Sequence, residues 1–160
     1  MLSVGIGEYA ITDDYNETLI THALGSCVAV IMHCKVSKHT ALAHVVLPQK
    51  AIDNQSSIYN KPSYFANDIV PKLAYYFLND LRCGNNLEVK IIGGANSKKK
   101  DDVFLVGEKN LIMINNLLKE FGIKADFSET GGNISRTVSI KASNGEVNIC
   151  LLYTSPSPRD

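Results

Sequence analysis

The strongest constraint on the fold is a pair of apolar runs on either side of a short polar segment. Val28 to His33 and Ala41 to Leu47 are rich in β-branched and other apolar residues, whereas residues 35–40 are mostly polar. Two such runs around a short polar loop predict an antiparallel hairpin. Pro48 ends the second run, because proline has no backbone N–H to donate to a neighbouring strand.

The predicted hairpin also places a thiol near an imidazole. Cys27 stands at the start of the first run, directly after Gly25 and Ser26, and His44 lies within the second run. With the turn centred near residues 36–37, Cys27 lies opposite roughly positions 45 to 47, one or two steps from His44. Cross-strand and diagonal neighbours lie within roughly 8 Å of one another. A cysteine beside a histidine is the minimal arrangement for nucleophilic catalysis, although a cysteine in a β-rich core is more often a small buried hydrophobe.

Length and composition exclude several classes of protein. The chain has 160 residues, and its apolar and charged fractions of 45% and 20% are ordinary for one soluble globular domain. Sixteen basic residues balance sixteen acidic ones, so the chain lacks the basic character of a nucleic-acid-binding protein. No apolar run reaches the roughly 20 residues of a membrane span. The first residues have neither a basic n-region nor a long apolar h-region, so we do not expect secretion. We therefore expect a cytoplasmic protein that does not insert into a membrane.

The cysteines and histidines do not form a metal-binding pattern. The four cysteines contain no C-x2-C pair, which structural zinc sites usually have, so zinc is the weaker interpretation of this composition. Free thiols in a reducing cytoplasm are the default expectation, and Cys34, Cys83 and Cys150 are expected to be inert. The glycine pairs at 93–94 and 131–132 fit no phosphate-binding motif and are expected to be tight turns. No metal is predicted.

Two helices are predicted from apolar spacing. The first covers Ser63 to Leu81, with Ser63 as its N-cap and Pro71 inside the pattern, where proline should kink or split the helix. The second covers Glu108 to Phe121 and ends at a glycine. Gln49 to Pro62 is expected to be a long loop near the site.

The rest of the chain indicates short strands. Asn144-Gly145 is a strong hairpin signal between the last two of them. Strands combined with two helices predict an α+β fold with helices packed on a mixed or antiparallel sheet. Residues 1–150 are expected to form one domain, and residues 151–160, with two prolines, are expected to be a disordered or non-native tail. The further strands are predicted at Val4–Ile11, Thr18–Ala23, Leu87–Ile92, Val103–Val106, Ile123–Ser128, Arg136–Ala142 and Glu146–Leu151.

Five sequence blocks, in order, resemble the CheD family of chemoreceptor glutamine deamidases. The resemblance covers about residues 1 to 150. The blocks are Thr21 with Leu24-Gly25-Ser26-Cys27-Val28-Ala29-Val30, then Ala43-His44-Val45-Val46-Leu47-Pro48, Lys90-Ile91-Ile92-Gly93-Gly94-Ala95, Val106-Gly107-Glu108-Lys109-Asn110, and Gly131-Gly132-Asn133 followed by Arg136.

The resemblance implies a fold, a reaction and a catalytic set. The implied fold is a layered α/β/α sandwich similar to the catalytic domain of the cytotoxic necrotizing factor toxins. The implied reaction is hydrolysis of receptor glutamines to glutamate and ammonia by a cysteine, a histidine and a threonine, which match Cys27, His44 and Thr21. The implied substrates are the cytoplasmic helices of methyl-accepting chemotaxis receptors. No cofactor is expected, because a cysteine hydrolase carries its own nucleophile.

The chemistry of these residues fits such a reaction. A neighbouring imidazolium or a helix N-terminus lowers a cysteine pKa from about 8.5 to between about 3.5 and 7.5, so we expect Cys27 to react faster at pH 7 than the other cysteines. Cys27 would attack the carboxamide, His44 would protonate the leaving nitrogen and then activate water, and Thr21 would orient His44 or hold the substrate. The backbone N–H groups near Ser26 and Cys27 are candidate oxyanion donors.

A second class of function stays open at the level of sequence. CheD proteins also bind a CheC-type phosphatase of the response regulator, so the chain could act chiefly as an adaptor between that phosphatase and chemoreceptors. Cys27 and His44 favour the enzyme, because an adaptor has no need of them.

Overall fold

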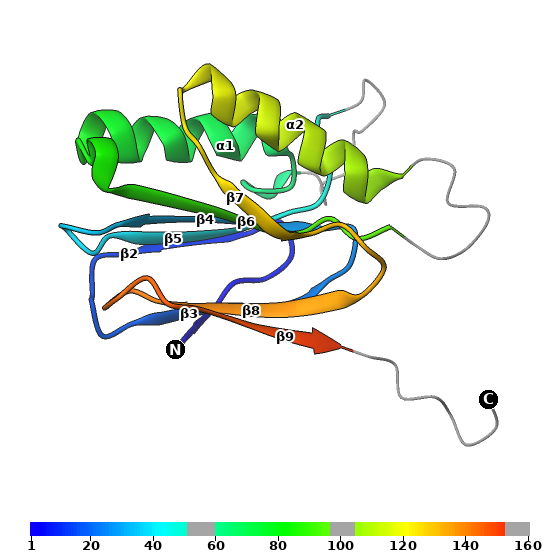
Figure 1. Ribbon diagram of the computed structural model, residues 1–160, viewed down its shortest axis with the longest axis horizontal. Helices are drawn as coiled ribbons and strands as arrows, with labels where there is room; N and C mark the ends of the chain where they lie inside the picture. Colours follow the sequence, from blue (N-terminus) through cyan, green and yellow to red (C-terminus); the bar gives the residue numbers. More distant parts are fainter. Residues whose placement is uncertain (51–59, 97–104, 153–160) are drawn as a thin grey trace.

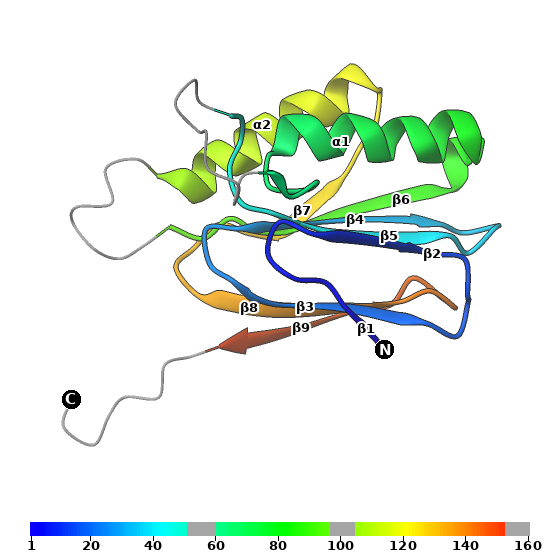
Figure 2. The same cartoon turned by 180° about the vertical axis from the view of Figure 1, so that it is seen from behind.

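Three layers make up the protein in the computed structural model, which describes residues 1–50, 60–96 and 105–152. Two helices lie on one face of a five-stranded sheet, and a four-stranded sheet covers the opposite face (Figure 1). The view from behind shows the same stacking (Figure 2). The prediction of an α+β fold with mixed sheets is confirmed.

The central layer is built around the predicted hairpin. Strands β4 (Val28–Cys34) and β5 (Thr40–Val45) pair in antiparallel fashion, and every residue in both strands is buried. Strand β6 (Leu87–Gly93) pairs with the free side of β4, which makes β4 a central strand. The sheet order is β2-β5-β4-β6-β7, where β2 is Tyr9–Thr12 and β7 is Asp126–Thr130.

The outer layer is a smaller sheet of order β1-β3-β8-β9. Strand β3 (Thr18–Leu24) is antiparallel to β8 (Ser135–Lys141), which forms a hairpin with β9 (Val147–Leu152), as the Asn144-Gly145 signal predicted. The short strand β1 (Leu2–Ser3) runs parallel to β3 at the other edge. Alternate residues of β8 are buried, so this sheet turns one face toward the central sheet.

Helix α1 (Ala66–Tyr75) differs from its prediction in two ways. It is not split at Pro71, because a run of buried apolar residues holds the helix against the sheet on both sides of the proline. The departure from α geometry comes later, in the π-helical turn η2 (Tyr76–Asp80). Ser63 is not the N-cap: Phe65 occupies that position without a side-chain capping bond, and Ser63 is buried two residues earlier.

Helix α2 (Val106–Glu120) confirms the second predicted helix and starts two residues earlier than expected. Val106 therefore belongs to a helix, so the predicted strand at 103–106 is wrong at that residue, while residues 103–104 lie outside the described part. Of the predicted strand at 4–11, only residues 9–11 belong to a strand, as part of β2, and the short strand β1 precedes it. The predicted strand at 123–128 begins later, at Asp126. Residues 51–59 of the predicted loop and residues 153–160 of the predicted tail are likewise outside the described residues.

Two apolar clusters occupy the two spaces between layers. One joins the helices to the central sheet, and the other joins the two sheets. Strand β4 contributes to both, with Val30 and Met32 on the helix side and Ala29 and Ile31 on the sheet side. The expected α/β/α layering is therefore wrong in its third layer, which is a sheet. The side of the central sheet away from the helices packs on apolar residues that alternate along β3 and β8. Such alternation is typical of a strand and not of a helix.

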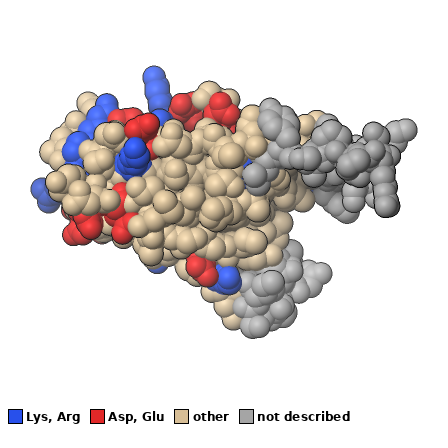
Figure 3. Space-filling model, turned by 90° about the horizontal axis from the view of Figure 1, so that it is seen from below, with Lys and Arg blue, Asp and Glu red and all other residues tan. Residues whose placement is uncertain are grey.

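The face of the outer sheet is largely uncharged. In Figure 3, which views the molecule from this side, Lys and Arg side chains are interspersed with Asp and Glu near the rim and leave the centre without charge. Neither helix in the described part of the chain has the length and apolar character that crossing a bilayer requires.

Candidate active site

The hairpin register places Cys27 beside His44, as predicted. Ala29 pairs with His44 and Val28 with Val45, so Cys27, one residue before β4, is diagonal to His44. Diagonal neighbours of this kind lie roughly 7–8 Å apart. Cys27 is partly exposed, whereas His44 is only 1% exposed. A partly exposed thiol therefore stands next to an imidazole that is shielded from solvent.

The three predicted site residues lie on facing layers. Cys27 and His44 lie on the face of the central sheet that packs on the outer sheet, and Thr21 lies on β3 of the outer sheet. Cys27 packs against the cluster between the sheets, and His44 is opposite Ala29, a member of that cluster. Thr21 comes from β3 in the outer sheet, and a bulge follows it before Leu24. The site therefore lies between the two sheets, at the end where β3 leads into β4.

A chain of hydrogen bonds fixes the tautomer of His44. The Thr21 hydroxyl donates to the Val4 carbonyl at 2.7 Å and also lies 2.7 Å from His44 Nδ1. A hydroxyl has one hydrogen to donate, so Thr21 must accept from an Nδ1–H group of His44. The neutral ring then carries its lone pair on Nε2. That atom is buried and has no hydrogen-bond partner among the described residues, so it is free to accept a proton.

Burial moves the pKa values of the thiol and the imidazole in opposite directions. It raises the pKa of Cys27 to about 11 and lowers the pKa of His44 to about 4, because each charged form loses water. The expected lowering of the Cys27 pKa is therefore wrong. The structure gives His44 Nε2 no hydrogen bond to the Cys27 thiol, and a neutral imidazole supplies no positive charge to stabilise a thiolate. Both groups are neutral at pH 7.

The backbone around Cys27 is held at three consecutive carbonyls. The Gly25 carbonyl accepts from Ala95 N–H at 2.9 Å, and the Cys27 carbonyl accepts from Gly94 N–H at 2.9 Å. Between them, the Ser26 carbonyl accepts from the side chain of Asn110, also at 2.9 Å. The structure assigns no acceptor among its described residues to the N–H groups of Ser26 and Cys27. These two donors are therefore available to a ligand.

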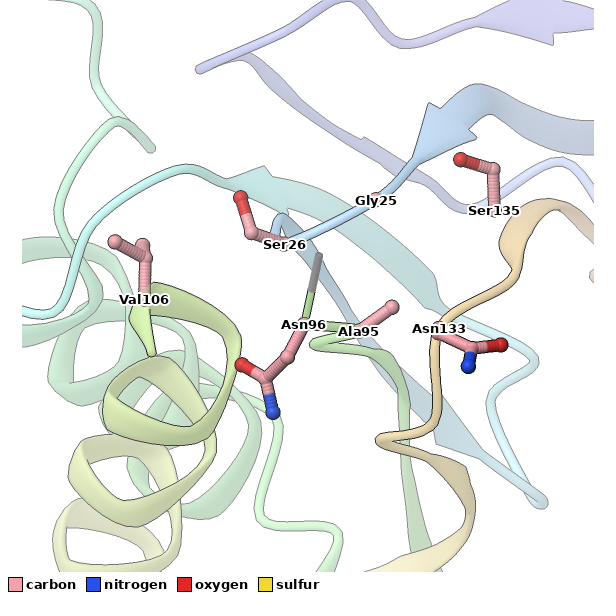
Figure 4. Close-up of a pocket in the computed structure, with 7 residues that line it drawn as sticks. All are labelled: Gly25, Ser26, Ala95, Asn96, Val106, Asn133 and Ser135. Carbon is pink, nitrogen blue, oxygen red and sulfur yellow. The ribbon is translucent and has the colours of Figure 1, made fainter. Parts of the chain in front are cut away.

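A cavity of about 370 Å³ opens next to this loop (Figure 4). Neither Cys27 nor His44 lines the cavity, but its Gly25–Ser26 wall leads directly to Cys27. The polar side chains around it come from the β3–β4 loop, the segment after β6 and the start of β8. The lining residues are Gly25, Ser26, Ala95, Asn96, Val106, Asn133 and Ser135.

The other cysteines have different surroundings. Cys34 and Cys83 are buried near the far end of β4, and burial, together with the neighbouring Cys34 thiol, raises the pKa of Cys83 to about 12. Cys150 is exposed on β9. Within the described ranges, no group of three or more His, Cys, Asp and Glu side chains is arranged to hold a metal ion.

Asn110 is a site residue to which the sequence assigned no role. Its side chain is fully buried, and its Nδ2 atom donates to the Ser26 and Val46 carbonyls, each at 2.9 Å. A signal was present in the sequence, because Asn110 stands one turn before Ile114 on the buried stripe of α2. A polar side chain on an apolar stripe needs a buried partner, and here the partners are the segments that carry Cys27 and His44.

Comparison with known proteins relates the chain to one family over most of its length. Residues 46–150 match the family described as CheD chemotactic sensory transduction. A probable chemoreceptor glutamine deamidase CheD of Syntrophotalea carbinolica is 36% identical, and the match covers 92% of each chain. A chemoreceptor glutamine deamidase CheD of Thermotoga maritima is 35% identical over 90% of this chain and 87% of its own. A further relative, from Methanococcus vannielii, is 33% identical over 93% and 90% of the two chains.

Proposed function

The chain belongs to the CheD family, and we propose that it hydrolyses selected glutamine side chains of chemotaxis receptors to glutamate and ammonia. Relatives with this reaction in their names match over most of the chain. The observation that carries the proposal is the hydrogen-bonded pair of Thr21 and His44 behind Cys27. It leaves a base with a free lone pair next to a partly exposed thiol.

The first half of the reaction forms a thioester. Cys27 Sγ bonds to the carbonyl carbon of the substrate carboxamide while its proton passes to His44 Nε2. The carbonyl oxygen becomes an oxyanion. When the tetrahedral intermediate collapses, the carbon–nitrogen bond breaks and His44 returns the proton to the nitrogen, so ammonia leaves and neutral His44 is regenerated.

The second half consumes one water molecule. His44 Nε2 accepts a proton from the water as its oxygen bonds to the thioester carbon. The carbon–sulfur bond then breaks, Cys27 recovers the proton from His44, and the substrate leaves as glutamate. The Nδ1–H bond to Thr21 keeps the ring in one orientation throughout both halves, because Thr21 is itself held by the Val4 carbonyl.

The unpaired N–H groups of Ser26 and Cys27 are the proposed oxyanion donors. They are adjacent to the nucleophile, and the structure assigns them no acceptor among its described residues. Removing a single donor of this kind from an enzyme typically costs about 10²- to 10³-fold in kcat. This arrangement supports the proposed cysteine-hydrolase site, the type of site that the similarity of the CheD fold to the cytotoxic necrotizing factor catalytic domain implies.

The partners and location follow from the same proposal. The substrates are the cytoplasmic helices of methyl-accepting chemotaxis receptors, which places the enzyme in the cytoplasm. A CheC-type phosphatase is a second proposed partner, and a pull-down with that protein tests it separately from deamidation.

The deciding test measures ammonia release from a purified chemoreceptor cytoplasmic domain, with mass spectrometry to locate glutamines converted to glutamate. We expect the wild-type chain to be active and Cys27→Ala to lose at least about 10³-fold in rate. Cys150→Ser is the matched control, because Cys150 is exposed on β9, where it pairs with Thr137, and its loss should leave the rate unchanged. Equal activity in Cys27→Ala would refute the proposed nucleophile.

Thr21 offers a second comparison in the same assay. Thr21→Val keeps the shape of the side chain but removes the bonds to Val4 and His44, so kcat should fall by about tenfold or more as part of the His44 contribution is lost. Thr21→Ser keeps the hydroxyl and should retain most of the activity. Equal rates in these two variants would show that the hydroxyl does not position His44.

A further inference from the structure

We infer that Asn110 is a positioning residue that aims the Cys27 N–H at the oxyanion of the substrate. The inference rests on the proposed deamidase function and adds to it a residue that touches neither the thiol nor the substrate. Asn110 is fully buried on the second turn of α2.

The first step is the pair of bonds that Asn110 makes. One nitrogen, Nδ2, uses both of its hydrogens, one on the Ser26 carbonyl and one on the Val46 carbonyl, each at 2.9 Å. Ser26 immediately precedes Cys27, and Val46 is two residues after His44. A single amide therefore connects the segment that carries the nucleophile to the segment that carries the base, and α2 supplies it from outside both strands.

The second step follows from the geometry of the peptide bond. In a trans peptide the carbonyl and the N–H point in opposite directions, and the described chain contains no cis peptide bond. The Ser26 carbonyl shares a peptide unit with the Cys27 N–H. Because Asn110 draws that carbonyl toward α2, the Cys27 N–H must point away from α2, where it has no acceptor among the described residues.

The third step is that the hydrogen bonds to the neighbouring carbonyls do not by themselves fix the direction of the Cys27 N–H. Gly94 and Ala95 hold the carbonyls of Cys27 and Gly25, which belong to the peptide units on either side. The unit between Ser26 and Cys27 is held by Asn110. Without the Nδ2 bond, this peptide unit is free to rotate between its fixed neighbours, and the N–H loses its defined direction. A donor that is not pre-oriented stabilises an oxyanion less well.

The test compares kcat, KM and Cys27 alkylation in wild type, Asn110→Ala and Asn110→Asp on the purified receptor domain. Asn110→Asp keeps the size of the side chain but replaces the donor by an oxygen. We expect kcat to fall at least tenfold in both variants while KM stays within twofold. Alkylation of Cys27 by iodoacetamide, read by peptide mass spectrometry at pH 9, should stay within threefold of wild type, because this displacement forms no oxyanion.

Two controls on the same helix separate positioning from loss of stability. Ile114→Ala removes a fully buried side chain one turn away, and Asn116→Ala removes an exposed amide. Both should keep wild-type kcat when assayed below their melting temperatures. If Asn110→Ala does not fold, the inference is tested by comparing the kcat of the isosteric Asn110→Asp with that of Ile114→Ala.

Several outcomes would overturn the inference while leaving the deamidase proposal intact. An unchanged kcat in the Asn110 variants, a rise in KM alone, or a parallel fall in kcat and Cys27 alkylation would each show that Asn110 does not act through the oxyanion donor. A fall in kcat of the same size in Ile114→Ala would show that it is a stability effect. By contrast, wild type without activity would refute the proposed function itself.

Discussion

At the scale of single residues, the number of hydrogens available for hydrogen bonds decides the tautomer of His44. Thr21 has one hydroxyl hydrogen, and the Val4 carbonyl takes it, so His44 must supply the hydrogen between Nδ1 and Thr21. This count leaves Nε2 as the base. Burial keeps both His44 and Cys27 neutral, so in the proposed mechanism the thiolate forms only during the attack.

The protonation state of Cys27 can be measured directly. The difference in thiolate absorbance between wild type and Cys27→Ser should be absent at pH 7 and appear only toward pH 11, because burial raises the Cys27 pKa to about 11. For the same reason exposed Cys150 should be alkylated faster than Cys27 at pH 7, the reverse of what the sequence suggested. A thiolate signal from Cys27 at pH 7 would contradict this account.

The pH dependence of the reaction should report His44. Its pKa is lowered to about 4, so the ring is protonated, and unable to accept the thiol proton, only below that pH. We expect kcat/KM to be level from about pH 5.5 upward through neutrality and to fall as pH decreases through about 4. An unshifted histidine would place this fall near pH 6.5. Circular dichroism at each pH verifies that the loss of rate is not acid unfolding.

At the scale of elements, helix α2 supports the loop of residues 25–27 between β3 and β4. Its N-terminal Glu108 N–H donates to the Asn96 side chain at 3.3 Å. Gly107 lies so close to the segment after β6 that an added Cβ would be 2.4 Å from the carbonyl oxygens of Gly94 and Ala95. That same segment holds the carbonyls of Gly25 and Cys27. The helix, the turn after β6 and the loop of residues 25–27 are therefore in direct contact.

This close packing predicts how one methyl group added at Gly107 affects stability and activity. Gly107→Ala should destabilise the protein by about 1–3 kcal/mol, because backbone atoms cannot move aside for the new Cβ. It should also lower kcat, since the displaced segment positions Cys27. Glu108→Ala, at the next and exposed position, is the control and should change stability by less than about 0.5 kcal/mol. Urea titrations and kinetics on both variants test the prediction, and equal unfolding midpoints would contradict it.

At the scale of the whole molecule, the two apolar clusters are coupled through one strand. Adjacent residues of β4 enter different clusters, Val30 on the helix side and Ile31 between the sheets. Neither cluster can come apart without exposing β4. The proposed catalytic residues depend on this coupling, because Thr21 belongs to the outer sheet while His44 and Cys27 belong to the central layer.

Unfolding should therefore be a single transition. Leu19→Ala empties space between the sheets, and Ile69→Ala empties space under the helices; both side chains are fully buried. Each should cost about 2–5 kcal/mol and shift one common calorimetric peak. Exposed Ile112 provides the control, and Ile112→Ala should leave the peak in place. Two separate peaks in either core variant would show that the layers unfold independently.

What the sequence determined by itself was the local structure around the nucleophile. Apolar runs around a polar segment predicted the β4–β5 hairpin and its register, the Asn144-Gly145 pair predicted the β8–β9 hairpin, and apolar spacing predicted α2. These features depend on residues near one another in the chain, so a pattern of side chains is enough to define them. The proximity of Cys27 to His44 followed from the hairpin alone.

What only the tertiary structure decided was everything that requires distant segments to meet. The packing of the outer sheet on the central one, which replaces the expected second layer of helices, brings Thr21 to His44 from another sheet. The packing of α2 brings Asn110 to Ser26 and Val46, 84 and 64 positions away along the chain. The pKa values of Cys27 and His44 depend on how much water these layers exclude. Burial is a property of the assembled layers, so no local pattern could have supplied it.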